Sequence, residues 1–104
     1  MSKEKVLIII PAYNESENIE SVISYLADAA PQYDYLIVND GSTDGTLRIC
    51  KEARFSYLDL PINMGIGGAV QAGYVYARKN DYDIAVQMDG DGQHDAAYLE
   101  KLLE

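Results

Sequence analysis

Most of the chemistry that this sequence can offer lies in the segment Met88–Asp95. Asp89 and Asp91 stand two positions apart after an apolar stretch that predicts a strand, and the alternating glycines let the backbone turn sharply. Carboxylates on a tight loop suit Mg²⁺ or Mn²⁺, which proteins often hold through one or two carboxylates plus substrate phosphates. A polar surface turn is the alternative, but there the two charges would repel each other without a counter-ion. The segment therefore indicates a metal-dependent enzyme acting on a nucleotide-linked substrate.

Three further polar or glycine-rich clusters also follow apolar runs. They span Pro11–Glu15, Asp40–Thr46 and Asn63–Ala69. Each alone has a structural explanation, as a helix start, an ordinary turn or a close helix–strand contact. The functional interpretation of the glycine cluster is that backbone N–H groups at a helix start face phosphate oxygens. The joint occurrence of all the clusters carries more weight, because ligands of parallel sheets gather beyond the carboxyl ends of the strands.

Apolar runs and helical spacing alternate along the chain, which predicts the elements that position these clusters. Pro11 is expected to end the first strand. Asn14 or Ser16 is expected to cap the first helix, which Pro31 closes, and Thr43 or Asp44 to cap the second. Strands are predicted over 5–10, 35–38, 56–60 and 82–88. The first two helices are predicted to run from their caps to Pro31 and to about Ala53, and two further helices are predicted over 68–79 and 95–104. Such alternation predicts an α/β fold with a parallel sheet between layers of helices.

Composition limits the class of protein. The 104 residues allow one domain, and 48% hydrophobic residues predict a packed core. The net charge of −9 argues against a nucleic-acid partner, since Arg78-Lys79, the one basic pair, reads as a solvated helix end. Cys50 is interpreted as a small core residue in preference to a reactive thiol. No apolar run is long enough to span a bilayer, so a cytoplasmic chain is expected.

Three other motifs fail on specific residues. A dinucleotide-binding fingerprint needs glycines after the first strand, where Pro11–Glu15 has none, and no phosphate loop with Gly-Lys-Ser or Gly-Lys-Thr occurs. The acidic segment also resembles a calcium-binding EF-hand loop. However, His94 occupies the position of the turn glycine, and a predicted strand precedes the loop in place of a helix.

The clusters, in their order over residues 6–95, resemble the motifs of glycosyltransferase family 2. The matching segments are Pro11–Glu15, Asn39–Thr46, Asn63–Ala69 and Asp89–Asp95. The last segment, with Gln93 and His94, is most similar to the dolichol- or polyprenol-phosphate sugar transferases of that family. The resemblance implies a GT-A fold, which is a Rossmann-like parallel sheet in a three-layer αβα arrangement. It also implies inverting transfer of a sugar from a GDP- or UDP-linked donor with Mg²⁺ or Mn²⁺.

The same resemblance assigns expected roles to individual residues. Asp89 and Asp91 are the expected catalytic pair that holds the metal against both phosphates, and Gln93 completes the metal's ligands. Asp40 is expected to accept a base N–H. The nucleoside pocket is expected to be lined by Pro11, Ala12, Tyr13 beside the base and Glu15 on the ribose, with the backbone at Gly65 and Gly90 also close to the donor. His94 either positions the donor or acceptor or supports the loop.

Two departures from the family pattern are visible. Ala96 stands where relatives commonly carry proline, which affects a helix start and not the chemistry. The family's domain continues well beyond this length, so the 104 residues are expected to be the donor-binding part of a truncated domain that lacks the acceptor half. The chain is therefore either the donor half of a glycosyltransferase or a module that binds a nucleotide sugar and metal without transfer. Expected partners are a lipid-phosphate or glycan acceptor, a membrane surface touched peripherally by the full-length protein, and a second copy that covers the exposed sheet edge.

Overall fold

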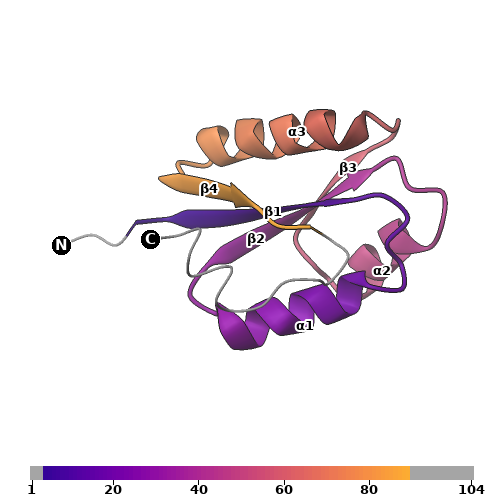
Figure 1. The fold of residues 1–104 in the computed structure, drawn as a ribbon, viewed down its shortest axis with the longest axis horizontal. Coiled ribbons are helices and arrows are strands. Elements are labelled where there is room, and N and C mark those ends of the chain that lie inside the picture. Colours follow the sequence, from indigo (N-terminus) through magenta and orange to yellow (C-terminus); the bar gives the residue numbers. More distant parts are fainter. Residues whose placement is uncertain (1–3, 90–104) are drawn as a thin grey trace.

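Four parallel strands form one sheet in the order β3-β2-β1-β4, with helices on both faces, in the computed structural model (Figure 1). The structure describes residues 4–89. Its elements, in chain order, are β1 (Val6–Ala12), α1 (Ile19–Ala29), β2 (Asp34–Asp40), α2 (Thr46–Glu52), β3 (Tyr57–Leu60), α3 (Gly65–Lys79) and β4 (Ile84–Gln87). No helix within this range is long and apolar enough to cross a membrane.

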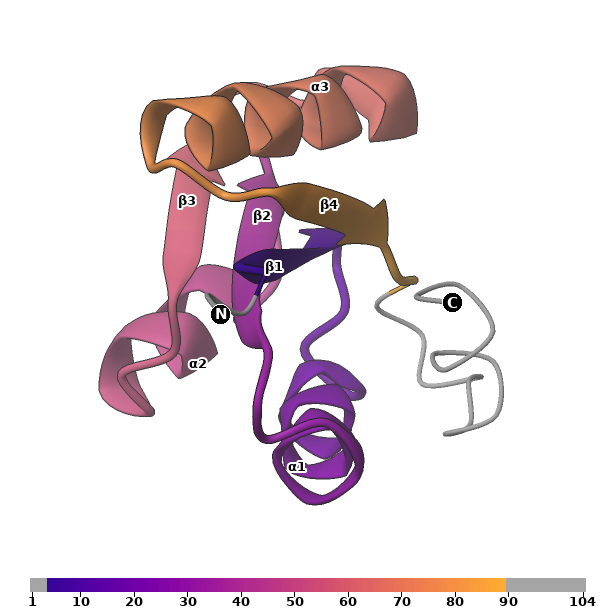
Figure 2. The ribbon, with the colours of Figure 1, turned by 90° about the vertical axis from the view of Figure 1, so that its left-hand side faces the viewer.

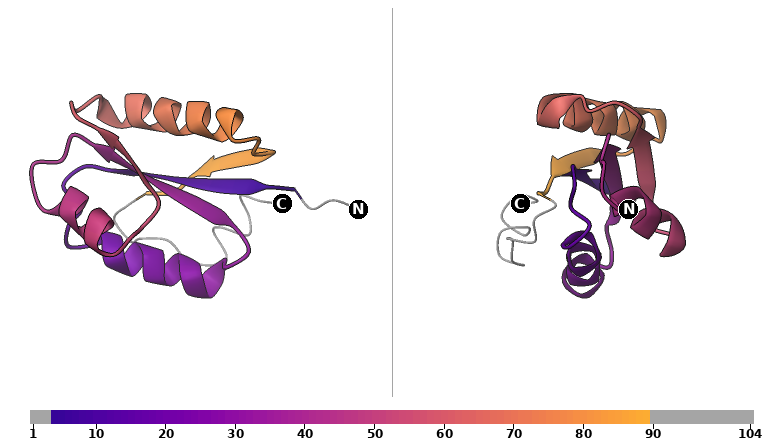
Figure 3. Two further views of the ribbon diagram at one scale, coloured as in Figure 1. Left: turned by 180° about the vertical axis from the view of Figure 1, so that it is seen from behind. Right: turned by 90° about the vertical axis from the view of Figure 1, so that its right-hand side faces the viewer.

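The central strand β1 is buried on both sides of the sheet. α3 covers one face, and α1 and α2 cover the other (Figures 2 and 3). Leu7 and Ile9 pack into the cluster on the α3 side, while Ile8 and Ile10 pack into the cluster on the other side. This two-sided burial explains the continuous apolar run of β1, which contrasts with the alternating pattern of a strand that has one face in water.

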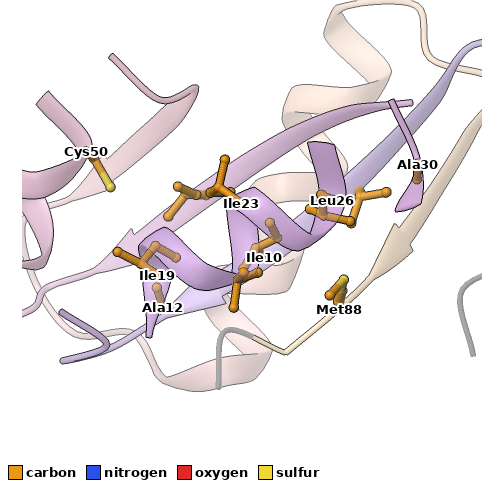
Figure 4. Close-up of a cluster of buried hydrophobic side chains, with 11 residues drawn as sticks. Ile10, Ala12, Ile19, Ile23, Leu26, Ala30, Cys50 and Met88 are labelled. Carbon is orange, nitrogen blue, oxygen red and sulfur yellow. The ribbon is translucent and has the colours of Figure 1, made fainter. Parts of the chain in front are cut away.

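The larger apolar cluster lies between the sheet and helices α1 and α2 (Figure 4). Ile19, Ile23 and Leu26 of α1 point into it at helical spacing. Cys50 of α2 is fully buried in the same cluster, and this burial raises the pKa of its thiol. The prediction that Cys50 is a core residue is therefore confirmed.

The prediction that Pro11 ends the first strand is wrong. β1 continues to Ala12, and Pro11 pairs with Val38 of β2. The carbonyl of Ile9 accepts the N–H of Met88, so odd-numbered residues of β1 direct their backbone groups towards β4. Pairing with β4 ends at Ile9, so the missing N–H of Pro11 lies beyond the paired part of β4 and interrupts no ladder.

The cap predicted for α1 is also wrong. The helix begins at Ile19 after Asn18, and neither Asn14 nor Ser16 caps it. Asn14 adopts a positive φ of 55°, and its side chain is bound to the loop after β2. At the second helix Gly45 occupies the cap position, although Asp44 accepts the N–H of Thr46 as a capping side chain would.

Two boundaries near the site differ from the prediction. α3 begins at Gly65, earlier than expected, because its first turn incorporates the glycines that were interpreted as a loop. Gly65 has a φ of 79°, a conformation that glycine adopts without strain. β4 is limited to Ile84–Gln87, and the helix predicted over 95–104 lies outside the described residues.

Candidate functional site

A pocket of about 510 Å³ opens at the carboxyl ends of the strands. It is lined by Pro11, Ala12, Tyr13, Glu15, Asp40, Asn63, Gly65, Ile66 and Asp89. These residues come from the ends of β1, β2 and β4 and from the start of α3. Every residue of the predicted donor site that lies within 4–89 therefore lines one pocket, whereas Gly90, Asp91, Gln93 and His94 lie outside the described residues.

Tyr13 presents a partly open aromatic ring to this pocket. Its side chain is 49% exposed, although Ala12 directly before it is buried. A large aromatic face that is left open to solvent beside a polar pocket can stack on a planar group. The positive φ of Asn14 turns the chain immediately after this ring.

Glu15 connects the pocket to the start of α1. Its backbone carbonyl accepts the N–H groups of Asn18 and Ile19 at 3.0 and 2.9 Å. Its carboxylate Oε1 accepts the side-chain amide of Asn18 at 3.1 Å. The N–H of Glu15 donates to the hydroxyl of Thr46 at 3.0 Å. Glu15 is thus hydrogen-bonded both to the start of α1 and to the first residue of α2, and its side chain lines the pocket.

Asp40 is a buried carboxylate whose partners come from the loop between β3 and α3. Its Oδ1 accepts the backbone N–H of Met64 at 2.7 Å, and its Oδ2 accepts the side-chain amide of Asn63 at 3.3 Å. The same amide also donates to the Asp40 carbonyl at 3.0 Å. Each carboxylate oxygen has two lone pairs, so these bonds leave capacity to accept a further N–H from the pocket.

Gly41 lets this loop approach the end of β2 closely. Its φ is +66°, and a Cβ placed there would lie 2.4 Å from the backbone nitrogen of Asn63. No L side chain fits at that distance, so the contact between the two loops requires glycine. Asn63 reaches both Asp40 and the pocket because of this approach.

Asn63 and Ile66 line the pocket but were not among the predicted site residues. Both belong to the glycine cluster, and the signal that could have found them is their position beside Gly65 after a strand end. Ile66 is 62% exposed and supplies an apolar surface. The polar side chain of Asn63 donates a hydrogen bond to Asp40 and lies on the same side of the pocket.

Asp89 lines the pocket from the β4 side. The N–H of Met88 bonds to Ile9, which continues the ladder beyond β4 and places Asp89 at the end of the sheet. Glu15 and Asp40 line the same pocket, so its electrostatic character is acidic. Within 4–89 no group of three or more His, Cys, Asp and Glu side chains is arranged to hold a metal ion.

One carboxylate is nevertheless a sufficient protein anchor for Mg²⁺, which commonly keeps waters and substrate phosphates as its other ligands. Asp89 has the hard oxygen donors that such an ion prefers, and it lies at the pocket. The residues present therefore fit a divalent cation held jointly with a phosphorylated ligand. The predicted ligands Asp91 and Gln93 are not part of the described structure.

Comparison with known sequences supports one family. The model of the family described as Glycosyl transferase family 2 matches residues 7–104. An undecaprenyl-phosphate mannosyltransferase from Micrococcus luteus is 39% identical over 105 residues, covering 96% of this chain and 43% of that protein. A polyprenol monophosphomannose synthase from Mycolicibacterium smegmatis is 35% identical over 107 residues, covering 97% of this chain and 40% of that protein. The chain thus spans about two fifths of the length of these relatives.

Solved structures share the fold at low sequence identity. The crystal structure of a mycobacterial protein matches with a TM-score of 0.76 and 24% identity over 96% of this chain and 36% of that chain. The glucosyl-3-phosphoglycerate synthase of Mycobacterium tuberculosis in complex with UDP matches with a TM-score of 0.74 and 22% identity, over 96% of this chain and 39% of that chain. These likenesses confirm the predicted Rossmann-like α/β fold class.

Proposed function

The chain belongs to glycosyl transferase family 2, and we propose that its pocket holds the nucleoside diphosphate sugar donor of a glycosyltransferase. One observation carries the proposal. Residues from four separate segments, which the sequence motifs single out, line a single pocket at the carboxyl edge of the sheet. Ligands of open parallel sheets bind at this edge, where loops and helix starts meet.

The nucleoside end of the donor would occupy the side formed by β1 and β2. Tyr13 stacks on or flanks the base with its exposed ring, and Glu15 accepts hydrogen bonds from the ribose hydroxyls. Asp40 accepts a base N–H with the lone pairs that Met64 and Asn63 leave available. Pro11 and Ala12 form the wall between these groups, and the backbone at Gly65 approaches the donor from α3.

The diphosphate would lie towards Asp89. The pocket is acidic, so a dianionic diphosphate needs a cation between itself and the carboxylate. Asp89, with Asp91 and Gln93 beyond the described residues, would hold Mg²⁺ or Mn²⁺. When bound, such a cation supplies Lewis-acid stabilisation of the charge that develops on the leaving diphosphate. The structure with UDP and Mn²⁺ of the glucosyl-3-phosphoglycerate synthase, which shares the fold at 21% identity, is consistent with this choice of ion.

The proposed reaction is a displacement at the anomeric carbon of the donor sugar. The acceptor oxygen forms the new glycosidic bond on one face while the bond to the diphosphate breaks on the other, which inverts the configuration. Relatives named for undecaprenyl phosphate and polyprenol favour a polyprenyl phosphate as the acceptor. A glycan hydroxyl is the other acceptor class, and its proton would have to pass to a base as the new bond forms.

A second candidate function is a module that binds nucleotide sugar and metal but transfers nothing alone. The observation behind it is that this chain spans about two fifths of its relatives and that the pocket described above lies within it. We propose that the parent protein is the transferase and that the 104 residues by themselves behave as the binding module.

Titration calorimetry with UDP- and GDP-linked sugars, with and without Mn²⁺, tests the pocket. We expect Asp89→Asn to weaken metal-dependent binding about tenfold or more, because it removes a charge that holds the cation. Asp28→Asn, an exposed carboxylate on α1 away from the pocket, is the matched control and should bind like the wild type. Binding that chelator or Asp89→Asn leaves unchanged would disprove the diphosphate assignment.

A sugar-transfer assay separates the two candidate functions. Transfer to a polyprenyl phosphate by the longer parent protein, together with donor binding but no turnover by the 104 residues, is the expected result. Robust turnover by the 104 residues alone would refute the binding-module assignment.

The remaining partner assignments stay predictions. Within residues 4–89, β4 pairs with β1 on one side only, so its outer edge offers backbone groups to a second copy. Light scattering at high protein concentration tests the predicted homo-oligomer, and a monomer would contradict it. Vesicle flotation tests the predicted peripheral membrane contact of the full-length protein, and cell fractionation tests its predicted cytoplasmic location.

A further inference from the structure

We propose that Asn14 is a positioning residue, whose side chain clamps the loop after β2 against the loop after β1 and so fixes Tyr13 and Glu15. The inference rests on the proposed function, because those neighbours are the residues expected to contact the nucleoside. Asn14 is not among the residues that line the pocket. Its influence on a ligand therefore passes through the residues on either side of it.

The backbone of Asn14 forms the turn that separates Tyr13 from Glu15. Its φ of 55° lies in the left-handed region, which asparagine and glycine tolerate better than other residues. This turn sets the directions in which the chain leaves β1 and enters α1. A backbone held in this conformation persists where surrounding bonds determine it.

The side chain of Asn14 supplies those bonds. Its Oδ1 accepts the backbone N–H of Thr43 at 2.8 Å and that of Asp44 at 3.2 Å. Its own backbone N–H donates to the hydroxyl of Ser42 at 3.0 Å. Asn14, in the loop after β1 (the first loop), is therefore bound to three successive residues of the loop after β2 (the second loop), about 30 positions away in sequence.

The second loop also holds the residues that follow Asn14. Asp44 accepts the backbone N–H of Ser16 at 3.2 Å, and Thr46 accepts that of Glu15 at 3.0 Å. The hydroxyl of Thr46 in turn donates to Asp44. Asn14 Oδ1 holds Asp44, and Asp44 is in turn bonded to Thr46, the partner of the Glu15 N–H. Loss of the Oδ1 therefore loosens the loop on which the position of Glu15 depends.

Two substitutions separate the clamp from the backbone conformation. Asn14→Gly adopts the positive φ without strain but removes the Oδ1 acceptor, whereas Asn14→Asp keeps the acceptor. We expect Asn14→Gly to bind UDP or GDP about tenfold more weakly in calorimetry with Mn²⁺, and Asn14→Asp to stay within about twofold of the wild type. Tyr82→Phe is the control, since it removes a 2.7 Å hydrogen bond to Asp34 at the opposite end of the sheet and should leave affinity unchanged.

A second measurement distinguishes positioning from metal binding and from general destabilisation. The ratio of nucleotide affinities with and without Mn²⁺ should be the same in Asn14→Gly as in the wild type, because the nucleoside contacts are weakened and the metal contacts are not. Amide hydrogen exchange of Thr43 and Asp44 should accelerate in Asn14→Gly. Ser42→Ala, which removes only the bond to the Asn14 N–H, serves if Asn14→Gly does not fold, with an expected loss of about threefold in affinity.

The outcomes separate this inference from the proposed function. If the wild-type chain binds neither nucleotide, the proposed function fails and the inference fails with it. If the wild type binds a nucleotide and both Asn14→Gly and Ser42→Ala bind it as tightly as the wild type does, the inference alone is overturned. Equal losses in Asn14→Gly and Tyr82→Phe would also overturn it, because they would indicate general destabilisation.

Discussion

Asp40 accepts the backbone N–H of Met64 at 2.7 Å and so joins the end of β2 to the residue that precedes α3. The side chain of Asp40 is only 3% exposed, yet it also lines the pocket. A buried carboxylate is stable only when hydrogen bonds replace its lost hydration, and Met64 and Asn63 provide them. The same carboxylate thus holds the fold together at the site and offers an acceptor to a ligand.

Replacing Asp40 by asparagine should lower the free energy of unfolding by about 1–3 kcal/mol. The new amide can accept from Met64 with its oxygen, but its NH₂ group then faces the donor amide of Asn63. Urea unfolding followed by circular dichroism measures the loss. Asp28→Asn on the exposed face of α1 is the control and should stay within about 0.5 kcal/mol of the wild type. Equal stability of the two variants would contradict the structural role of Asp40.

The bond between Asp40 and Met64 illustrates what sequence patterns could and could not reveal. Apolar periodicity predicted the strands and helices of the described chain, and strand ends indicated where a pocket would form. Asp40 was predicted as a pocket residue for that reason. Its partner lies 24 positions away, and the contact depends on how closely two loops approach, which no local pattern encodes.

At Asn14 the prediction from local sequence was wrong. Local rules favour asparagine or serine before a helix as a cap, so Asn14 or Ser16 was predicted to cap α1. In the structure its oxygen bonds to Thr43 and Asp44, and α1 begins only at Ile19. Tertiary partners outweighed the local preference here, because two backbone N–H groups of a neighbouring loop lie within reach of one acceptor. Pro11 was misplaced for a similar reason, since the limited extent of β4 decides whether its missing N–H matters.

Gly41→Ala should destabilise the chain by about 2 kcal/mol or more. A left-handed backbone costs a residue with a Cβ about 1–2 kcal/mol, and the added carbon would also collide with the backbone of Asn63 at 2.4 Å. Gly45→Ala in the same loop is the control, since its φ is −81° and its Cβ would meet only Arg48 at 3.5 Å. Thermal unfolding should show a lower midpoint for Gly41→Ala alone. Similar midpoints would show that the two loops are not held in contact.

Two glycines of α3 should respond to alanine in opposite directions. Gly67→Ala should stabilise the chain by up to about 1 kcal/mol, because nothing lies within 4 Å of its Cβ and alanine favours the helix. Gly73→Ala should destabilise it by about 1–3 kcal/mol, since its Cβ would lie 2.5 Å from a methyl group of the fully buried Ile9. Urea unfolding of both variants tests the close packing of α3 on β1. A gain in stability for Gly73→Ala would show that this contact is loose.

Asp44 should give the chain a component of stability that disappears in acid. Desolvation by its neighbours raises the pKa of its carboxyl, but hydrogen bonds from Thr46 and Ser16 together outweigh that effect and lower the pKa to about 2. A carboxyl whose pKa is lower in the folded state than in the unfolded state, where it is about 3.9, stabilises the fold above pH 4. That contribution falls as the pH drops from about 4 to about 2, because the carboxyl takes up its proton in the unfolded state first, and it is lost once both states are protonated. The exposed position of Asp44 makes the effect modest, since solvent screens its charge.

Comparison of the wild type with Asp44→Asn isolates this component from the other carboxylates of an acidic chain. Asparagine keeps an oxygen for the N–H of Thr46 but removes the charge and places an NH₂ group towards the N–H of Ser16. At pH 5 to 6 the variant should therefore unfold at a lower urea concentration than the wild type, and the difference should shrink steadily below pH 4. Added salt should reduce the difference at pH 6, because the charge is accessible to solvent. A difference that stays constant from pH 6 to pH 2 would show that the charge of Asp44 does not stabilise the loop that Asn14 anchors.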